Sequence, residues 1–378
     1  MFYNPRVSRF SLLSIIFLNL ALSPALWSQN QTRIQSTGVQ STGVDANLRG
    51  ISVTRMGAGK TSVGKTVVWA SGSKGTVLRS LDEGKSWIRL KVDSDSAAEL
   101  DFRDVEAFGK DTAYVMSSGE GEKSRIYKTT DGGRSWKLQY TDKRSGFFLD
   151  SLACESRTYC FALSDPVDGR FLVLSTSDGQ HWKELPPDKM PTALPAEGAF
   201  AASGTSIALC NHNIYFGTEG PAARVFRSND HGRSWTAAET PMASGNASSG
   251  IFSLACSDRY VIAVGGDYKN PESAERVAAY SADHGKTWHP AEHPPTGYRS
   301  SVSIVAATAF AVGPTGEDVS LDYGASWKAV DSLNLNAAAL TTEGGGWAVG
   351  PKGTVKHFQV RVPDSIRRQS QREKSATQ

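Results

Sequence analysis

Charged and aromatic residues scattered along this 378-residue chain could carry chemistry. Arginine binds a carboxylate through two parallel hydrogen bonds, so several converging arginines would hold an acidic ligand. Carboxylates paired with each other or with a tyrosine can perform acid–base or nucleophilic work at a glycosidic bond. Because any polar chain of this size offers such groups by chance, their meaning depends on where the fold places them. The cations are Arg49, Arg103, Arg224 and Arg299, and the groups that could work beside them are Asp150, Asp165, Glu197, Tyr268 and Tyr298.

Metal, nucleotide and nucleophile motifs are missing from the sequence. His289 and His293 are four residues apart, but the stretch is rich in proline and cannot form the helix that would turn both toward one ion. Residues 57–61 lack the spacing and the following helix of a phosphate-binding loop, and no Gly-x-Ser-x-Gly sequence occurs. The net charge of +3 is too small to indicate nucleic acid. We expect no metal, no cofactor and no nucleic-acid partner.

An eight-residue phrase indicates the elements that must position these groups. It reads Ser/Thr, any residue, Asp, any residue, Gly, any residue, Ser/Thr, Trp, and full copies span 80–87, 129–136, 228–235, 281–288 and 320–327. A degenerate copy spans 175–182, with Ser177 in the Asp position and His181 in the second Ser/Thr position. Recurrence at intervals of 39 to 53 residues is typical of stacked supersecondary units. The structural residues are then Asp82, Trp87, Asp131, Trp136, Trp182, Asp230, Trp235, Asp283, Trp288, Asp322 and Trp327.

Each part of the phrase has a mechanical role in a tight turn. The Asp carboxylate accepts hydrogen bonds from backbone N–H groups, Gly supplies a positive φ, and Trp is a large apolar plate that packs between units. The phrase therefore predicts a turn between two β-strands. It resembles the Asp box, or BNR repeat, which recurs in sialidases, sortilin-type receptor domains and the photosystem II assembly/stability factor family. The resemblance implies a β-propeller.

The strand pattern gives seven blades, so the predicted fold class is an all-β, seven-bladed β-propeller over residues 48–360. Inner strands are expected to begin near residues 48, 102, 149, 197, 252, 299 and 337. The seventh unit lacks an Asp box and a fourth strand, which the chain start near 32–38 is expected to supply, because joining both ends removes exposed sheet edges. Residues 29–47 are thus a polar lead-in or this closing strand, and 361–378 are a disordered basic tail.

The alternation of strand direction assigns loops to rims. Asp boxes lie on one rim, while the opposite rim carries the starts of the inner strands, around the central channel, and the turns between second and third strands. These turns are longer in blades two to five, and insertions on one rim usually mark a binding face. The predicted binding rim comprises Arg49, Arg103, Asp150, Asp165, Arg170, Glu197, Arg224, Asp267, Tyr268 and Arg299.

Two functions fit this rim. The chain from about 45 to 360 resembles exported bacterial propellers related to the photosystem II assembly factor group, which implies a non-catalytic module that docks onto a partner protein. The alternative is a sialidase-like glycoside hydrolase or glycan-binding propeller. Such enzymes hold the substrate carboxylate with three arginines and use a Tyr–Glu nucleophile and an Asp acid. Residues 48–51, Leu-Arg-Gly-Ile, match only part of their Phe/Tyr-Arg-Ile-Pro motif.

The N-terminus predicts export. Arg6 and Arg9 precede an apolar run over 10–27 and small residues, as in a secretory signal peptide at 1–28; the alternative is an uncleaved membrane anchor. We expect a periplasmic or secreted protein with no stable membrane span after cleavage. Four cysteines allow three pairings. A bridge within a hairpin and one between blades are expected, and small buried hydrophobes are the alternative; the residues are Cys154, Cys160, Cys210 and Cys256.

Overall fold

Short strands separated by glycine-containing turns make up most of the chain. The structure is a computed structural model, and it describes residues 1, 33–55, 65–92 and 96–361. Across these ranges there is no α-helix, and so no helix that could cross a membrane. Residues 2–28 of the predicted signal peptide and 362–378 of the predicted tail lie outside the described residues.

In the first three blades each strand pairs with the next one along the chain, because tight turns join antiparallel neighbours. Blade one contains β2 (Leu48–Arg55), β3 (Thr66–Gly72), β4 (Thr76–Ser80) and β5 (Ile88–Leu90). Blade two contains β6 (Asp101–Phe108), β7 (Thr112–Ser118), β8 (Arg125–Thr129) and β9 (Lys137–Thr141). Blade three contains β10 (Leu149–Ser156), β11 (Tyr159–Val167), β12 (Arg170–Thr176) and β13 (Lys183–Glu184). Short 3-10 turns interrupt the connections at η1 (Ala97–Glu99), η2 (Gly121–Lys123) and η3 (Pro187–Lys189).

Blades four to six keep the pattern with one addition. Blade four contains β14 (Ile207–Cys210), β15 (Asn213–Gly217), β17 (Arg224–Ser228) and β18 (Thr236–Glu239). Blade five contains β19 (Asn246–Ser257), β20 (Tyr260–Asp267), β21 (Ala278–Ser281) and β22 (His289–Pro290). A fifth strand, β16 (Glu219–Gly220), reaches from a turn of blade four to the inner edge of β19. Blade six contains β23 (Ser301–Val305), β24 (Thr308–Gly313), β25 (Gly316–Ser320) and β26 (Lys328–Asp331).

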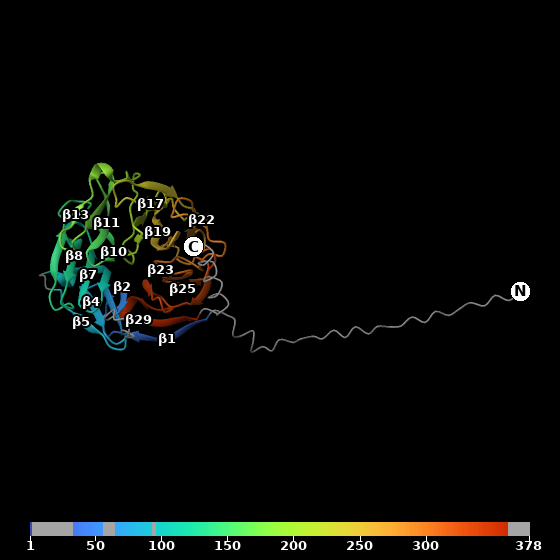
Figure 1. Ribbon diagram of the computed structural model, residues 1–378, viewed down its shortest axis with the longest axis horizontal. Coiled ribbons are helices and arrows are strands. Elements are labelled where there is room, and N and C mark those ends of the chain that lie inside the picture. Colours follow the sequence, from blue (N-terminus) through green and yellow to red (C-terminus); the bar gives the residue numbers. More distant parts are fainter. Residues whose placement is uncertain (2–32, 56–64, 93–95, 362–378) are drawn as a thin grey trace. The chain divides into compact units, whose positions relative to one another are not determined.

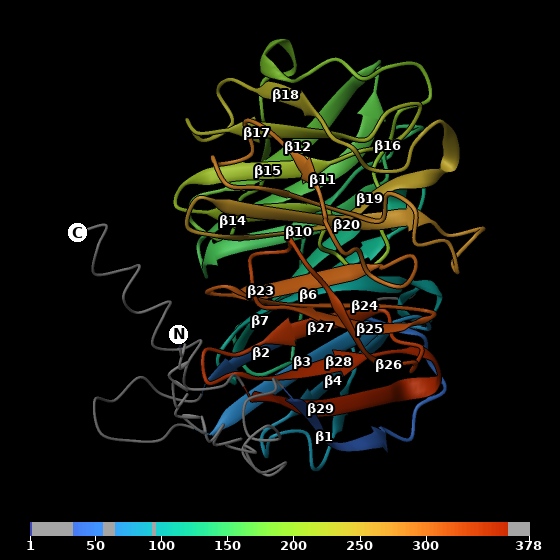
Figure 2. The same cartoon turned by 90° about the vertical axis from the view of Figure 1, so that its right-hand side faces the viewer.

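The seventh blade closes the ring with strands from both ends of the chain. It runs from β27 (Ala337–Leu340) through β28 (Gly345–Val349) and β29 (Thr354–Arg361) to β1 (Arg33–Ser41), with η4 (Pro351–Gly353) before β29. The two views show β1 beside β29 (Figures 1 and 2). Each inner strand contacts the inner strands of both neighbouring blades, including β27 with β2. The predicted seven-bladed, end-joined propeller is confirmed.

The Asp boxes form the turns that the sequence predicts. In the first copy, the amide of Ser86 donates to Asp82 Oδ1 at 2.9 Å, and the Ser80 hydroxyl donates to the same oxygen at 2.7 Å. The amide of Gly84, at φ +82°, donates to Ser80 Oγ at 2.8 Å. The hydrogen bonds from Ser86 and Ser80 lower the pKa of Asp82 to about 2. The carboxylate is therefore a structural group of the turn.

The degenerate copy begins one residue later than predicted, at Thr176, while its second half keeps the predicted alignment. Thr176 and Asp178 take the Ser/Thr and Asp positions, so the placement of Ser177 as the Asp equivalent is wrong. The amide of His181 donates to Asp178 Oδ1 at 2.8 Å, and His181 Nδ1 lies 2.7 Å from Oδ2. Only the variable residue between Asp and Gly is missing. The turn keeps its carboxylate, because its hydrogen bonds tolerate a shorter loop.

The closing tryptophans pack between blades. Trp136 of blade two meets Trp69 of blade one edge-on at 6.4 Å between ring centroids, and Trp182 of blade three meets Tyr114 of blade two at 6.1 Å. Edge-to-face contacts at these separations stabilise apolar interfaces. The interface of blades six and seven also holds a buried ion pair, in which Lys356 Nζ lies 2.7 Å from Glu317 Oε1.

One disulfide lies within the third blade, and a second joins the fourth blade to the fifth. Cys154 and Cys160 face each other across the β10–β11 hairpin and are bonded. Cys210 of β14 is bonded to Cys256 of β19, which links the inner strands of adjacent blades. The second bridge closes the longer loop, so we expect it to restrict the unfolded chain more.

Candidate functional site: the hub mouth and an acidic pocket

A β-bulge recurs near the start of four inner strands. The pairing register of β2, β6, β10 and β19 shifts around Arg49, Arg103, Asp150 and Phe252, respectively. A bulge leaves one residue unpaired and re-aims its side chain. These residues occupy equivalent positions around the channel, which places the predicted ring of inner-strand starts at one end of the hub.

Residues 199–206, which we call the hub cover, lie across that end. Ser203 Oγ donates to the carbonyl of Ser300 at 2.8 Å, and the amide of Leu254 donates to the carbonyl of Thr205 at 2.8 Å. Gly204 pairs with Ser151 of β10 through an isolated bridge. Because the segment touches inner strands on several sides of the ring, it crosses the axis. The predicted start of the blade-four inner strand at 197 is wrong for this reason: the chain leaves the blade and returns only at Ile207.

Arg49 and Arg103 hold the hub cover in place. Arg49 Nη1 donates to the carbonyl of Ala202 at 3.0 Å, and Arg103 Nη1 donates to the carbonyl of Ala201 at 2.9 Å. Arg103 also pairs with Asp101 at 2.9 Å. Burial, followed by the neighbouring charge of Arg103, lowers the pKa of Arg49. The predicted rim residues Arg49 and Arg103 therefore lie at the channel but are bonded to the chain itself, which supplies carbonyl acceptors for both.

Aromatic rings pack on the hub cover. Phe200 stacks on Phe252 with centroids 3.5 Å apart, and Tyr298 packs against Phe252 at 4.5 Å. Tyr268, which is 47% exposed, lies edge-on to Phe200 at 6.1 Å. The predicted rim residue Tyr268 thus belongs to an aromatic surface at the hub mouth, partly open to solvent.

An acidic pocket of about 800 Å³ opens beside the hub cover. Its walls come from the β11–β12 turn, the long connection between blades three and four, and β16. Asp165 and Glu219 approach the same point: a Cβ placed on Gly198 would lie 2.8 Å from Asp165 Oδ1 and 3.1 Å from Glu219 Oε1. Glycine at 198 leaves both carboxylates in place, whereas a Cβ there would force the Asp165 carboxylate to move.

Burial makes these carboxylates unusually basic. It raises the pKa of Asp165 to about 6, although the amide of Ala199 donates to Asp165 Oδ1 at 3.0 Å. Burial and the charges of Asp165 and Glu197 raise the pKa of Glu219 to about 7. Behind them Asp150 is wholly buried, and burial and the charge of Asp165 raise its pKa well above the usual range. The site concentrates negative charge that its surroundings do not fully neutralise.

Glu197 and Arg224 stabilise one wall of this pocket. Their charged groups bond each other and are not free to bind a ligand in the pocket. Arg224 Nε donates to Glu197 Oε1 at 2.8 Å, and Arg224 Nη2 pairs with Oε2. The hydroxyl of Thr218 and the amide of Leu194 also donate to Glu197, each at 2.8 Å. Glu197 is only 4% exposed, so it is a saturated structural carboxylate and not a free rim group.

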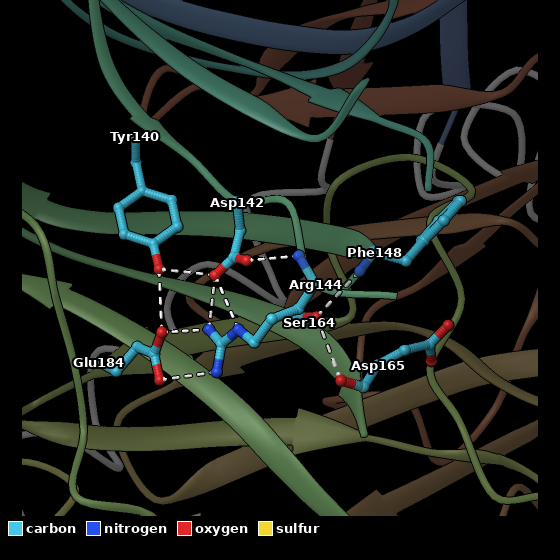
Figure 3. Close-up of polar contacts among 7 residues, drawn as sticks. All are labelled: Tyr140, Asp142, Arg144, Phe148, Ser164, Asp165 and Glu184. Atoms are coloured by element: carbon cyan, nitrogen blue, oxygen red, sulfur yellow. Dashed lines mark hydrogen bonds and ion pairs between the residues drawn. The ribbon is translucent and has the colours of Figure 1, made fainter. Parts of the chain in front are cut away.

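A second ion-pair cluster supports the β9–β10 loop at this pocket. Arg144 Nε donates to Asp142 Oδ2 at 3.0 Å, and the guanidinium also pairs with Glu184, which accepts from the Tyr140 hydroxyl at 3.0 Å (Figure 3). These contacts fasten the β9–β10 loop that carries Gly146, a pocket-lining residue. Further along the loop, the carbonyl of Phe148 accepts from the Asp165 amide at 3.0 Å. The loop therefore positions Asp165 directly.

The remaining predicted rim residues are dispersed. Arg170 lines the acidic pocket and donates to the carbonyl of Met190 at 2.8 Å. Asp267 lies beside a smaller pocket of about 210 Å³. Arg299 is wholly buried and bonded to Asp318 Oδ2 at 2.7 Å, so its prediction as a rim group is wrong. Its guanidinium needs that partner because an isolated buried charge is costly.

Sequence reasoning missed Glu219 and the hub cover. Glu219 lies within a turn predicted to be long, but it occurs singly and carries no motif. The hub cover had a usable signal, namely the long connection between β13 and β14, which exceeds the usual loop length of a compact domain. In the part of the chain that the structure describes, no three His, Cys, Asp or Glu side chains are placed to hold a metal ion.

The repeats and the closed ring define the class as a seven-bladed Asp-box β-propeller, here with a covered hub mouth. A family model described as BNR/Asp-box repeat matches residues 279–290. The photosystem II assembly lipoprotein Ycf48 of Synechococcus sp. (strain CC9902) is 34% identical over 74 residues, which are 20% of this chain and 20% of that protein. The chain thus matches only about a fifth of the length of this curated relative.

Solved structures share the fold at low identity. A structure described as YCF48 bound to D1 peptide is 12% identical and has a TM-score of 0.58, covering 86% of this chain and 97% of that one. YCF48 from Cyanidioschyzon merolae is 15% identical with a TM-score of 0.58, covering 86% and 99%. The predicted resemblance to propellers of the photosystem II assembly factor group is confirmed.

Proposed function

We propose that the protein is an exported, non-catalytic propeller that binds a partner protein through the rim bearing the hub cover and the acidic pocket. The observation that carries the proposal is the gathering of the aromatic surface and the acidic pocket on one covered rim. A similar propeller is described as bound to D1 peptide, which supports a polypeptide ligand. The partner itself is a protein of the same compartment.

Site-specific photo-crosslinking tests the docking face. A photoreactive phenylalanine derivative would replace Tyr268 or Leu194, which are 47% and 41% exposed on the proposed rim. The matched control replaces Ile88, which is 51% exposed and directly follows an Asp box. We expect the same crosslinked protein from both rim positions and none from position 88. Equal yields from all three positions would contradict the proposal.

Export is part of the proposal. The basic start, the apolar run over 10–27 and the two disulfides favour an oxidising compartment such as the periplasm or the outside of the cell. Fractionation of the producing cells, followed by mass determination of the N-terminus, checks it. The expected result is an exported protein that begins near residue 29; an intact N-terminus in the membrane fraction would indicate an anchor.

One observation keeps the glycoside hydrolase alternative in view. Asp165 and Glu219 have raised pKa values near neutrality, as a catalytic acid requires. Against it, Arg49, Arg103 and Arg299 are bonded to other protein groups, so no three of them form a free carboxylate clamp. A fluorogenic glycoside panel with Asp165→Asn as the control decides. Turnover that disappears in the variant would replace the docking proposal.

A further inference from the structure

Among the described residues, several carboxylate oxygens at the acidic pocket have no hydrogen-bond partner. Glu219 Oε2 is buried without a hydrogen-bond partner. Asp150 is 0% exposed, and neither of its carboxyl oxygens has a hydrogen-bond partner. Burial and the charges of Asp165 and Glu219 raise its pKa, while the charge of Arg103 lowers it. Ionising buried carboxyl groups that lack partners is costly, so a site that holds several of them is suited to a ligand that supplies positive charge.

The nearby arginines do not fill this role. Arg224 is bonded to Glu197, and Arg103 is bonded to Asp101 and the hub cover. Arg170 lines the pocket but is exposed and donates to the carbonyl of Met190. Because these guanidinium groups are bonded elsewhere, a ligand from outside the fold can supply the positive charge that Asp165 and Glu219 lack.

The pocket walls match a long basic side chain. Pro166, Leu194 and Pro195 line the same space as the two carboxylates. The aliphatic stems of lysine and arginine cover apolar surface while the charged end seeks a partner. A guanidinium can also bond two carboxylates at once, because it presents five donors in a planar fork. A metal ion fits less well, because no group of three potential ligands is arranged for one among the described residues.

We propose that the acidic pocket is the receptor for an arginine or lysine side chain of the partner polypeptide. This inference rests on the proposed function and specifies its ligand chemistry. The stem lies along Pro166 and Leu194, and the charged end lies between Asp165 and Glu219, next to Gly198. The adjoining aromatic surface around Tyr268 then contacts the residues that flank the basic one.

Titration with short peptides tests the pocket on the isolated exported protein. The probes are acetyl-Gly-Arg-Gly-amide, its lysine equivalent and its citrulline equivalent, which keeps the shape of arginine without the charge. Nuclear magnetic resonance at pH 8 follows the amide signals of Gly146, Gly169 and Gly198, which line the pocket. We expect saturable shifts with the arginine and lysine peptides and none with citrulline. The doubly substituted Asp165→Asn/Glu219→Gln variant should bind at least tenfold more weakly.

Controls separate this inference from the docking proposal. Glu239→Gln removes an exposed carboxylate outside the pocket and should leave the titration unchanged. Equal shifts with citrulline, undiminished binding by the double variant, or shifts produced only by calcium chloride would overturn the inference. If crosslinking to the rim persists while the basic peptides do not bind, the pocket assignment fails and docking stands. If the peptides bind but no rim crosslink forms, docking fails instead.

Discussion

Arg103 Nη1 donates to the carbonyl of Ala201 at 2.9 Å across 98 residues of sequence. The bond joins the inner strand of blade two to a segment that precedes blade four. Arg49 makes the matching hydrogen bond to the carbonyl of Ala202. Arg49 and Arg103, which the sequence suggests as ligand-binding cations, therefore hold the hub cover in place. The positive groups of the hub act on the chain itself, whereas the negative groups beside it remain available.

Loss of these supports should loosen the hub cover. A charged donor to a carbonyl contributes about 1.5–3 kcal/mol, so Arg49→Ala or Arg103→Ala is expected to lower the free energy of unfolding by about that amount. Hydrogen exchange of amides in 199–206 should accelerate before exchange elsewhere. Arg233→Ala, at an exposed position of an Asp box, is the control. Unchanged exchange in 199–206 would show that the arginines do not hold the segment.

The Glu197–Arg224 pair should be sensitive to the loss of one partner. Arg224→Met leaves the buried Glu197 carboxylate without its cation, which typically destabilises by about 3–5 kcal/mol. Adding Glu197→Gln should restore part of the loss, because the buried charge is then removed. Urea unfolding of the two variants measures the difference. If the Arg224→Met/Glu197→Gln variant is less stable than Arg224→Met alone, the Glu197–Arg224 pair does not stabilise the pocket wall in this way.

Glu219 should make stability depend on pH. Its pKa is raised from 4.5 to about 7 by burial and by Asp165 and Glu197, while Asp150 and Arg224 are the other charges nearby. The folded protein therefore binds the proton of the Glu219 carboxyl group more tightly than the unfolded chain does. The stability that protonated Glu219 contributes is fully present below pH 4.5 and is lost as the pH rises through 7. Glu219→Gln should raise the melting temperature at pH 8 and have no effect at pH 4.

Calorimetry at both pH values checks this expectation, and Glu239→Gln should show no difference at either one. A Glu219→Gln variant that is destabilised at pH 8 would mean that the ionised carboxylate already has a partner in the folded protein. The unpaired charge on which the pocket proposal depends would then be absent.

The two disulfides should differ in their effect on stability. Loop-closure entropy predicts about 4 kcal/mol for the bridge of sequence separation 46 and about 2 kcal/mol for the bridge of separation 6. Urea unfolding of the Cys210→Ala/Cys256→Ala and Cys154→Ala/Cys160→Ala variants measures both. A larger loss from the hairpin bridge would show that local packing outweighs chain entropy here.

For much of the candidate site, the sequence predicts the rim on which it lies but not the residues that form it. The long turns of blades two to five predict a site on the rim where the acidic pocket lies, and Asp165 and Arg170 line that pocket. No pattern in the sequence predicts that Arg299 bonds to Asp318, because that pair depends on how the segment before β23 packs against β25. The same limit explains why Glu219 was missed: its environment is created by Gly198 and Asp165, which are distant in sequence.

The propeller, its Asp-box turns and the closing of its ring could all be predicted from the order of the amino acids. Those features follow from local hydrogen bonds and repeated apolar patterns, which are set within about one blade at a time. The path of residues 199–206 across the hub, and the identity of the buried polar groups without partners, became visible only in the folded chain. The reason is physical: whether a charged side chain is bonded or free depends on groups brought together by packing, and neighbours in sequence do not specify them.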